Sequence, residues 1–338
     1  MMSNNPSLET SVPQRNWWVV NATTDLSCIT LGWLLFFFAP YLLPQYFEEI
    51  RIISVAFLFG THRYFTFLLV YLDRSEFSRH PKLYIWIPIL CFVFVGVCYY
   101  FKIEEPEMFA VWYLFNFYHF VRQKYGILRI YSGKAGGGHK RLDEWTIYIW
   151  SAAGFLQVFA SGADIKAMDY LSYWFGGTPP QVIPQTLYAI AIVLTVLWLV
   201  HEFRSPGRPS VPKLLFLGSV IFLYGIGPTL SAGAIYIATS VNHASEYIAL
   251  VALTILNKDR VSHEDAPLLN RATGHIVRNT FLMVGALCAL LYVIKSLSLF
   301  FFLFFAYGTS FAHFVLDGYI WKLRRPKVAR EVGAATAG

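Results

Sequence analysis

Apolar segments long enough to cross a bilayer recur along almost the entire chain, and they restrict the fold to a membrane helix bundle. A transmembrane helix needs about 20 mostly apolar residues, because lipid offers no partner for backbone N–H and C=O groups. About ten segments approach or reach this length, at approximately residues 26–43, 52–72, 83–101, 108–131, 144–161, 183–200, 211–226, 231–256, 280–297 and 299–321. The sequence therefore predicts an all-α, polytopic integral membrane protein.

The composition agrees with this class and excludes others. Hydrophobic residues make up 56% of the chain and charged residues 14%, whereas a soluble domain has about 25% charged residues. The net charge of +7 does not indicate nucleic-acid binding, because the basic residues are distributed between the apolar segments. The four cysteines all lie in apolar segments without a CxxC pair, so they predict small buried side chains rather than disulfides.

Lysine and arginine residues divide unevenly between the loops, and this predicts the orientation. Short cytoplasmic loops of membrane proteins are enriched in these residues. If each apolar segment crosses once, about 22 of them fall on one side and about four on the other. The predicted topology has ten spans and both termini in the cytoplasm, with a polar N-terminal segment (1–25), a transmembrane domain (26–321) and a basic tail (322–338). A bacterial inner membrane is the expected location.

Two regions depart from simple spans. The seventh segment is short and contains Gly225, Gly227 and Pro228, which predict a break in its helix. The longest loop on the non-cytoplasmic side, residues 161–181, is rich in aromatic residues, glycine and proline. We expect this loop to lie as a lid at the membrane interface.

Four histidines lie inside apolar segments: His62, His119, His243 and His313. In the predicted topology their four spans run in the same direction. Counting to the next cytoplasmic basic residue at 1.5 Å per residue places all four roughly 14 to 22 Å below the cytoplasmic interface. Ionisable groups at such depth are costly unless they are paired, hydrated or functional. The shared depth predicts that the four imidazoles form one polar cluster.

Each histidine has a polar residue three or four positions later, on the same helical face. Such a partner can fix the tautomer of a metal-bound histidine or can itself bind the metal. The pairs are His62 with Thr66, His119 with Gln123, His243 with Glu246 and His313 with Asp317, and Asn242 adjoins His243. We expect Glu246 and Asp317 to ligate or to orient, and Thr66, Gln123 and Asn242 to support the ligands by hydrogen bonding.

Several cations also lie unusually deep. Arg63 adjoins His62. We expect it to serve in catalysis, either as an anchor for an acidic headgroup or as a counter-ion to Glu246 or Asp317. The alternative is an ion pair with a purely structural role. Arg122, Lys124 and Arg129 follow His119 closely. Their long side chains are expected to snorkel to the interface, the alternative being a polar opening to the cytoplasm.

Three interpretations of the histidine cluster remain open at this point. The histidines can hold the bundle together by hydrogen bonds between helices. They can also form a proton or solute pathway in a proton-coupled transporter. The third is a metal centre, because imidazole with carboxylate suits Fe, Zn, Mn or Cu. One or two non-haem iron ions are favoured over haem. Haem pairs in membrane bundles often lie at two depths, whereas these four histidines share one depth, and haem ligation has less need of the carboxylate partners found here.

The pattern resembles the Brp/Blh family of bacterial integral-membrane β-carotene cleavage oxygenases. The segment AHFVLDG at His313 and Asp317 is similar to a late His…Asp motif of that family, and HFVRQ at His119 is similar to an early His motif. This chain lacks a Pro-His-Gly-x-x-Asp segment and has no HxxxH pair. The absence of HxxxH also distinguishes it from the desaturase, hydroxylase and alkane-monooxygenase class, whose histidine boxes are dense. The resemblance implies a helical bundle whose histidines bind iron.

The sequence thus predicts a metal-dependent oxidoreductase or oxygenase of lipid metabolism. The expected ligands are His62, His119, His243 and His313, and the expected catalytic residues are Glu246, Asp317 and Arg63. The expected partners are a membrane lipid or other lipophilic small molecule and a separate electron-donor protein. A proton-coupled permease and a structural or assembly subunit of a membrane complex are the alternatives.

Overall fold

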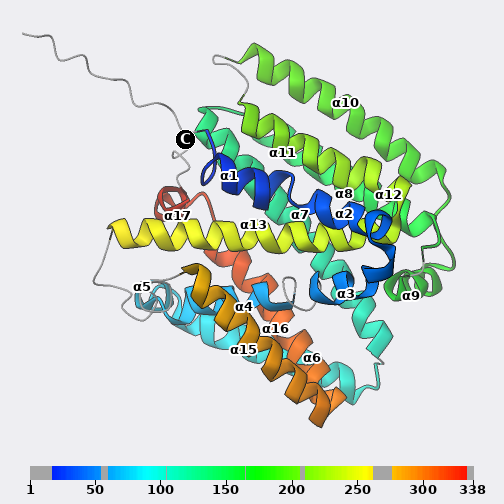
Figure 1. Ribbon diagram of the computed structural model, residues 1–338, viewed down its shortest axis with the longest axis vertical. Coiled ribbons are helices and arrows are strands. Elements are labelled where there is room, and N and C mark those ends of the chain that lie inside the picture. Colours follow the sequence, from blue (N-terminus) through cyan, green and yellow to red (C-terminus); the bar gives the residue numbers. More distant parts are fainter. Residues whose placement is uncertain are drawn as a thin grey trace, which may run out of the picture.

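The computed structural model of the chain describes residues 17–54, 60–103, 105–163, 165–205, 210–261 and 276–332. This part of the chain is helical and contains no β-strand, so the predicted all-α class is confirmed. Figure 1 shows long helices packed against one another, with short connections between them. Residues 1–16 of the predicted N-terminal segment and residues 333–338 of the basic tail lie outside the described residues.

The helices of the first half include the two that carry His62 and His119. In chain order they are α1 (Ala22–Thr24), η1 (Asp25–Thr30), α2 (Trp33–Leu42), η2 (Pro44–Tyr46), α3 (Phe47–Ile52), α4 (Gly60–Tyr71), α5 (Arg74–Phe77), α6 (Pro81–Tyr100), α7 (Glu105–Ala135) and α8 (Lys140–Ala160).

The helices of the second half include the two that carry His243 and His313. They are α9 (Lys166–Phe175), α10 (Val182–Arg204), α11 (Val211–Ile221), η4 (Phe222–Ile226), α12 (Gly227–Leu230), α13 (Ala232–Val261), α15 (Ile276–Leu297), α16 (Leu299–Ile320) and α17 (Pro326–Glu331). Each of the ten apolar segments predicted from the sequence therefore contains helix.

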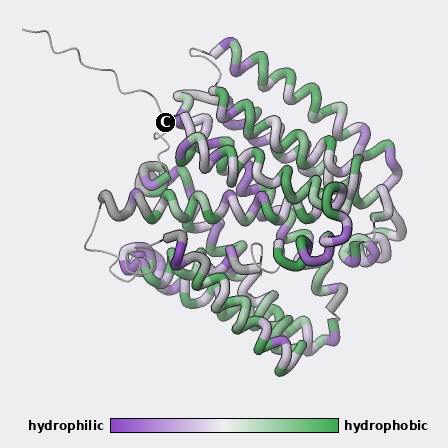
Figure 2. The backbone as a smooth tube through the Cα atoms, viewed as in Figure 1, coloured by the Kyte–Doolittle hydropathy of each residue, from purple (hydrophilic) through white to green (hydrophobic). Residues whose placement is uncertain are grey.

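Within the described ranges, four helices are long and apolar enough to cross a membrane. They are α6, α10, the continuous stretch Val211–Leu230, and α16. A fifth is added if the pair Ala22–Thr30 and Trp33–Leu42, which bends by 52°, is counted as one span. In α6 and α10 only 17% of the most apolar window is buried inside the protein. Figure 2 shows hydrophobic residues along α10, and its exposed side chains include Ile192, Val193 and Leu197.

The long helix α13 lies between two groups of helices and carries His243. It contacts α2 and η1 on one side and α4 on the other (Figure 1). Neither α13 nor α7 is among the four apolar spans, although they have 30 and 31 residues. Both carry charged side chains into the interior, such as Lys124 on α7 and Glu246 on α13. The most central helices are therefore less hydrophobic than those at the edge of the bundle.

The predicted break in the seventh segment is wrong. The helix continues from α11 through the π-helical turn η4 into α12, so Val211–Leu230 forms one stretch of 20 residues. The glycine that was expected to interrupt it instead allows α8 to approach. A Cβ atom added at Gly225 would lie 2.5 Å from Cζ3 of Trp150, a separation that real Cβ atoms do not show. Gly225 therefore serves helix packing, and its lower helix propensity is outweighed by this contact.

The predicted lid region, residues 161–181, contains the short helix α9, which packs against α7. Its buried face consists of Ala167, Met168 and Leu171, whereas Tyr173 and Phe175 are largely exposed. An amphipathic helix with exposed aromatic rings is typical of a membrane interface.

Candidate metal centre

The four predicted histidines converge on one point in the bundle. His62 lies on α4, His119 on α7, His243 on α13 and His313 on α16. One nitrogen of each ring can be chosen so that all four lie within 4.8 Å of one another. All four side chains are buried, with exposures of 1% to 8%. Their predicted convergence is confirmed, and together the four imidazoles can hold a metal ion.

The spacing of one pair of rings matches what one ion requires. The Nε2 atoms of His62 and His243 are 3.1 Å apart. Nitrogen ligands bound at 2.0–2.1 Å to the same ion lie about 3.0 to 3.4 Å from each other. The rings meet edge to face, with centroids 4.8 Å apart for His62 and His243 and 4.7 Å apart for His119 and His313.

The tautomer of His313 is set by a hydrogen-bonded chain across α4 and α16. The hydroxyl of Thr66 donates to Oδ1 of Asp317 at 2.8 Å and lies 2.6 Å from Nδ1 of His313. Because a hydroxyl has only one proton, a Thr66 that donates to Asp317 must accept the proton of His313 Nδ1. Nε2 of His313 then carries the free electron pair, which is the form that binds a metal.

Two ring nitrogens give an independent sign that a ligand belongs in the cluster. Nε2 of His119 and Nε2 of His313 are buried and have no hydrogen-bond partner among the described residues. The nearest carboxylate oxygen, Oδ2 of Asp317, is 3.7 Å from Nε2 of His119, too far for a hydrogen bond. Leaving a buried polar atom unpaired costs about 1–3 kcal/mol. An ion bound by both nitrogens removes this cost, so the donor set fits a metal.

Aromatic side chains close the walls of the cluster. The ring of Phe120 stacks on His243 with centroids 4.0 Å apart, and Phe314 lies 4.9 Å from His119. Tyr247 is 1% exposed, and its ring packs edge to face against His62 and His313. Its hydroxyl donates to Oδ1 of Asp317 at 3.0 Å. These walls exclude bulk water from the four nitrogens.

The structure contradicts the expected roles of three polar residues. Glu246 does not ligate or orient the histidines, because its Oε1 accepts from Nζ of Lys124 at 2.6 Å. Gln123 does not reach His119; its Nε2 donates to the carbonyl of His243 at 2.9 Å and to Oε2 of Glu246 at 3.0 Å. Asn242 accepts a short hydrogen bond from Lys124 and donates to the carbonyl of Ile29. These residues form a separate buried ionic network, which we call the Lys124 network, next to the centre.

The expected role of Arg63 as a counter-ion is also not seen. Its guanidinium donates to the carbonyl of Gly60 at 2.8 Å, to the carbonyl of Ala306 at 3.0 Å and, at short range, to the hydroxyl of Ser310. No ion pair joins Arg63 to Glu246 or Asp317 in the described part of the chain. Arg63 ties α4 to α16 just beyond His62, which makes it a structural residue of the site.

Two of the three cations after His119 do not snorkel. Lys124 is 1% exposed within its network, and Nη1 of Arg129 pairs with Oδ2 of Asp143 at 2.5 Å. Only Arg122 has a largely exposed side chain, and it donates to the hydroxyl of Tyr148 at 2.8 Å. The acidic partners that keep Lys124 and Arg129 inside come from other helices, α13 and α8, which the local sequence does not reveal.

Two important residues and one ion pair were missed in the sequence. Tyr247 follows His243 by four positions, and this spacing could have identified it, but Glu246 at three positions was chosen instead. Phe120 adjoins His119, yet it packs on the histidine of another helix. The pairing of Lys124 with Glu246 has no signal in the sequence beyond the burial of two opposite charges.

The chain through Thr66 gives a prediction for metal affinity. Replacing Thr66 by valine keeps the shape but removes the hydroxyl that connects His313 to Asp317. Loss of such an outer hydrogen-bond partner typically lowers metal affinity by about 10- to 100-fold, and titration of the metal with a competing chelator measures it. The matched control is Thr146→Val, another buried threonine that is remote from the four histidines. Equal affinity in both variants would contradict the assigned role of Thr66.

Comparison of the chain with protein-family models, with curated proteins and with solved structures finds no match.

Proposed function

We propose that the protein is a membrane-embedded, metal-dependent oxidoreductase of the oxygenase type, acting on a lipophilic substrate that enters from the bilayer. The observation that carries this proposal is the buried four-histidine cluster, with ligand nitrogens within 4.8 Å of one another. Burying a polar centre of this kind inside an apolar bundle costs free energy, so such a centre usually marks a functional site. The aromatic walls around it would keep water away from a reactive ion and admit an apolar molecule.

We infer that the cluster binds one ion of non-haem iron. Imidazole ligands suit Fe, Zn, Cu and Ni, and an oxidation requires a metal that changes its oxidation state. A single group of four histidines supports one ion better than two. Haem is disfavoured because neighbouring ring centroids are only 4.7 to 5.0 Å apart around the group of four, so a macrocycle between two rings would displace the others. The motif-level resemblance to Brp/Blh β-carotene oxygenases also favours iron.

The residues of this chain would have distinct roles around the ion. Iron bound here would supply the redox chemistry for the reaction of dioxygen with the substrate. The four histidines would hold the metal, and Thr66 with Asp317 would keep His313 in its metal-binding tautomer. Tyr247 shares Oδ1 of Asp317 and would hold that carboxylate in place. Phe120 and Phe314 would exclude water from the metal.

The proposed membrane arrangement has ten spans with both termini in the cytoplasm of a bacterial inner membrane. The strong division of lysine and arginine between alternate loops supports it. The exposed apolar faces of α6 and α10 would contact lipid, and the polar helices α7 and α13 would be shielded from lipid by their neighbours. Loops this short leave no room for an internal reductase domain, so an electron donor would be a separate protein.

Elemental analysis and optical spectra of the detergent-purified protein test the proposal. We expect about one iron per chain and no haem absorption. We also expect iron-dependent consumption of dioxygen when a membrane-lipid extract supplies the substrate. Stoichiometric zinc would overturn the redox function, and absence of any bound metal would overturn the metal centre as well.

A further inference from the structure

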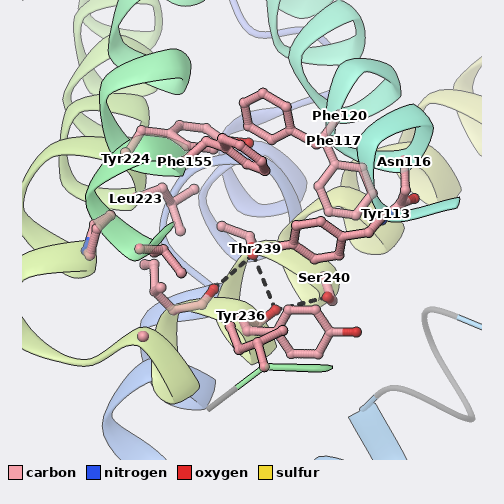
Figure 3. A pocket seen from close by; sticks show the side chains of 16 residues that line it. Tyr113, Asn116, Phe117, Phe120, Phe155, Leu223, Tyr224, Tyr236, Thr239 and Ser240 are labelled. Carbon is pink, nitrogen blue, oxygen red and sulfur yellow. Dashed lines mark hydrogen bonds between the residues drawn. The ribbon is translucent and has the colours of Figure 1, made fainter. Parts of the chain in front are cut away.

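A pocket lies directly beside the four-histidine centre, between α7, α8, η4 and α13 (Figure 3). The space inside it, counted together with the open solvent at its mouth, is about 550 Å³. Six of its 16 lining residues are aromatic: Tyr113, Phe117, Phe120, Phe155, Tyr224 and Tyr236. Rings of this kind offer flat apolar surfaces, which favour an unsaturated, apolar ligand.

The pocket and the histidine centre use the same two helices. Asn116 in the pocket precedes His119 by three residues on α7, and Ser240 in the pocket precedes His243 by three residues on α13. Three residues of helix correspond to about 4.5 Å along the axis. The ring of Phe120 lines the pocket and also stacks on His243 at 4.0 Å. One aromatic side chain therefore forms the wall between the pocket and a predicted metal ligand.

Two polar groups on the pocket wall lack hydrogen bonds. Oδ1 of Asn116 and the hydroxyl of Tyr224 are buried and have no partner among the described residues, and each side chain belongs to a residue that is 5% exposed. The threonine and serine hydroxyls of the wall are satisfied, because Thr239 and Ser240 donate to carbonyls of their own helix (Figure 3). Buried polar atoms are normally hydrogen-bonded, so these two indicate a ligand that carries a polar group.

We propose that this pocket binds the lipophilic substrate of the enzyme as an unsaturated, apolar molecule with a hydroxyl group. This inference rests on the proposed function and specifies its substrate class. The ligand hydroxyl donates to Oδ1 of Asn116 and accepts from the hydroxyl of Tyr224, and the apolar part lies between the aromatic rings. Phe120 separates this apolar part from the ion and must turn aside for the reaction. The substrate is thus an oxygen-bearing lipid rather than a pure hydrocarbon.

Two probes of the same isoprenoid skeleton test the inference: farnesol, which has a hydroxyl, and farnesene, which does not. Binding of both to the full chain in detergent is compared for the wild type, Tyr224→Phe and Asn116→Leu. We expect the wild type to prefer farnesol by about 5- to 10-fold, the effect of one hydrogen bond. Both variants should lose this preference and keep the affinity for farnesene. Equal binding of the two probes by the wild type, or an unchanged preference in both variants, would overturn the proposal.

The control and the metal content keep this test separate from the proposed function. Tyr64→Phe removes another buried hydroxyl without a hydrogen-bond partner, outside the pocket, and should leave the preference unchanged. Tyr224→Phe should not lower the unfolding midpoint, because it removes an unpaired polar atom. Iron is measured in every preparation, and all variants should retain it. A wild type without metal that still prefers farnesol would refute the oxidoreductase function and leave the binding site standing.

Discussion

Replacing His119 and His243 together by alanine is expected to abolish stoichiometric metal binding. The two side chains come from α7 and α13, and their ring centroids are 4.9 Å apart. Loss of an outer hydrogen-bond partner alone lowers metal affinity by about 10- to 100-fold, so loss of two direct ligands should exceed about 100-fold. Inductively coupled plasma analysis of purified protein, with chelator titration, measures the effect.

The matched control is the pair His139→Ala/His201→Ala. These two rings also lie edge to face, 5.5 Å apart, but they do not belong to the four-histidine group. The control should retain its metal. The fold of the double variant is checked by circular dichroism, because two buried imidazoles are replaced by smaller side chains. If His119→Ala/His243→Ala keeps a full equivalent of metal, the assigned ligands are wrong.

Replacing Lys124 by methionine is expected to destabilise the fold by about 3–5 kcal/mol. The Lys124–Glu246 pair is almost completely buried, at 1% and 0% exposure. Removing one member of such a pair leaves an uncompensated charge in a medium that cannot solvate it, which accounts for a loss of this size. Gln123 alone remains to donate to Glu246. Reversible unfolding in mixed detergent micelles measures the change in the free energy of unfolding.

The double variant Lys124→Met/Glu246→Leu separates pairing from packing. If charge burial causes the loss, the double variant should recover most of the stability, because it leaves only Asn242 and Gln123 to satisfy. The exposed pair Arg51–Glu48 provides the control, since its side chains are 48% and 62% exposed. Glu48→Gln should have no measurable effect. A double variant as unstable as Lys124→Met would show that packing, and not charge, stabilises this region.

Helical periodicity identified residues on a common face but could not decide which of them reach a neighbour. Glu246 and Tyr247 follow His243 by three and four residues, and both spacings fit one face. In the structure Tyr247 lies at the histidines, whereas Glu246 turns to Lys124 on α7. Successive helix positions differ by about 100°, so a modest rotation of α13 exchanges their environments. Only packing against α2, α4 and α7 fixes that rotation.

By itself the sequence determined the helical class, because long apolar segments in lipid admit little else. It also predicted a common depth for the four histidines, because helical rise converts residue number into height. The convergence of His62, His119, His243 and His313 followed from that common depth. The tertiary structure decided which side chains meet between helices. Examples are the bridge from Thr66 to His313, the pairing of Lys124 with Glu246, and the position of Phe120 between the histidines and the pocket. The sequence does not reveal these contacts, because the lateral order and the rotation of the helices depend on segments that are far apart in the chain.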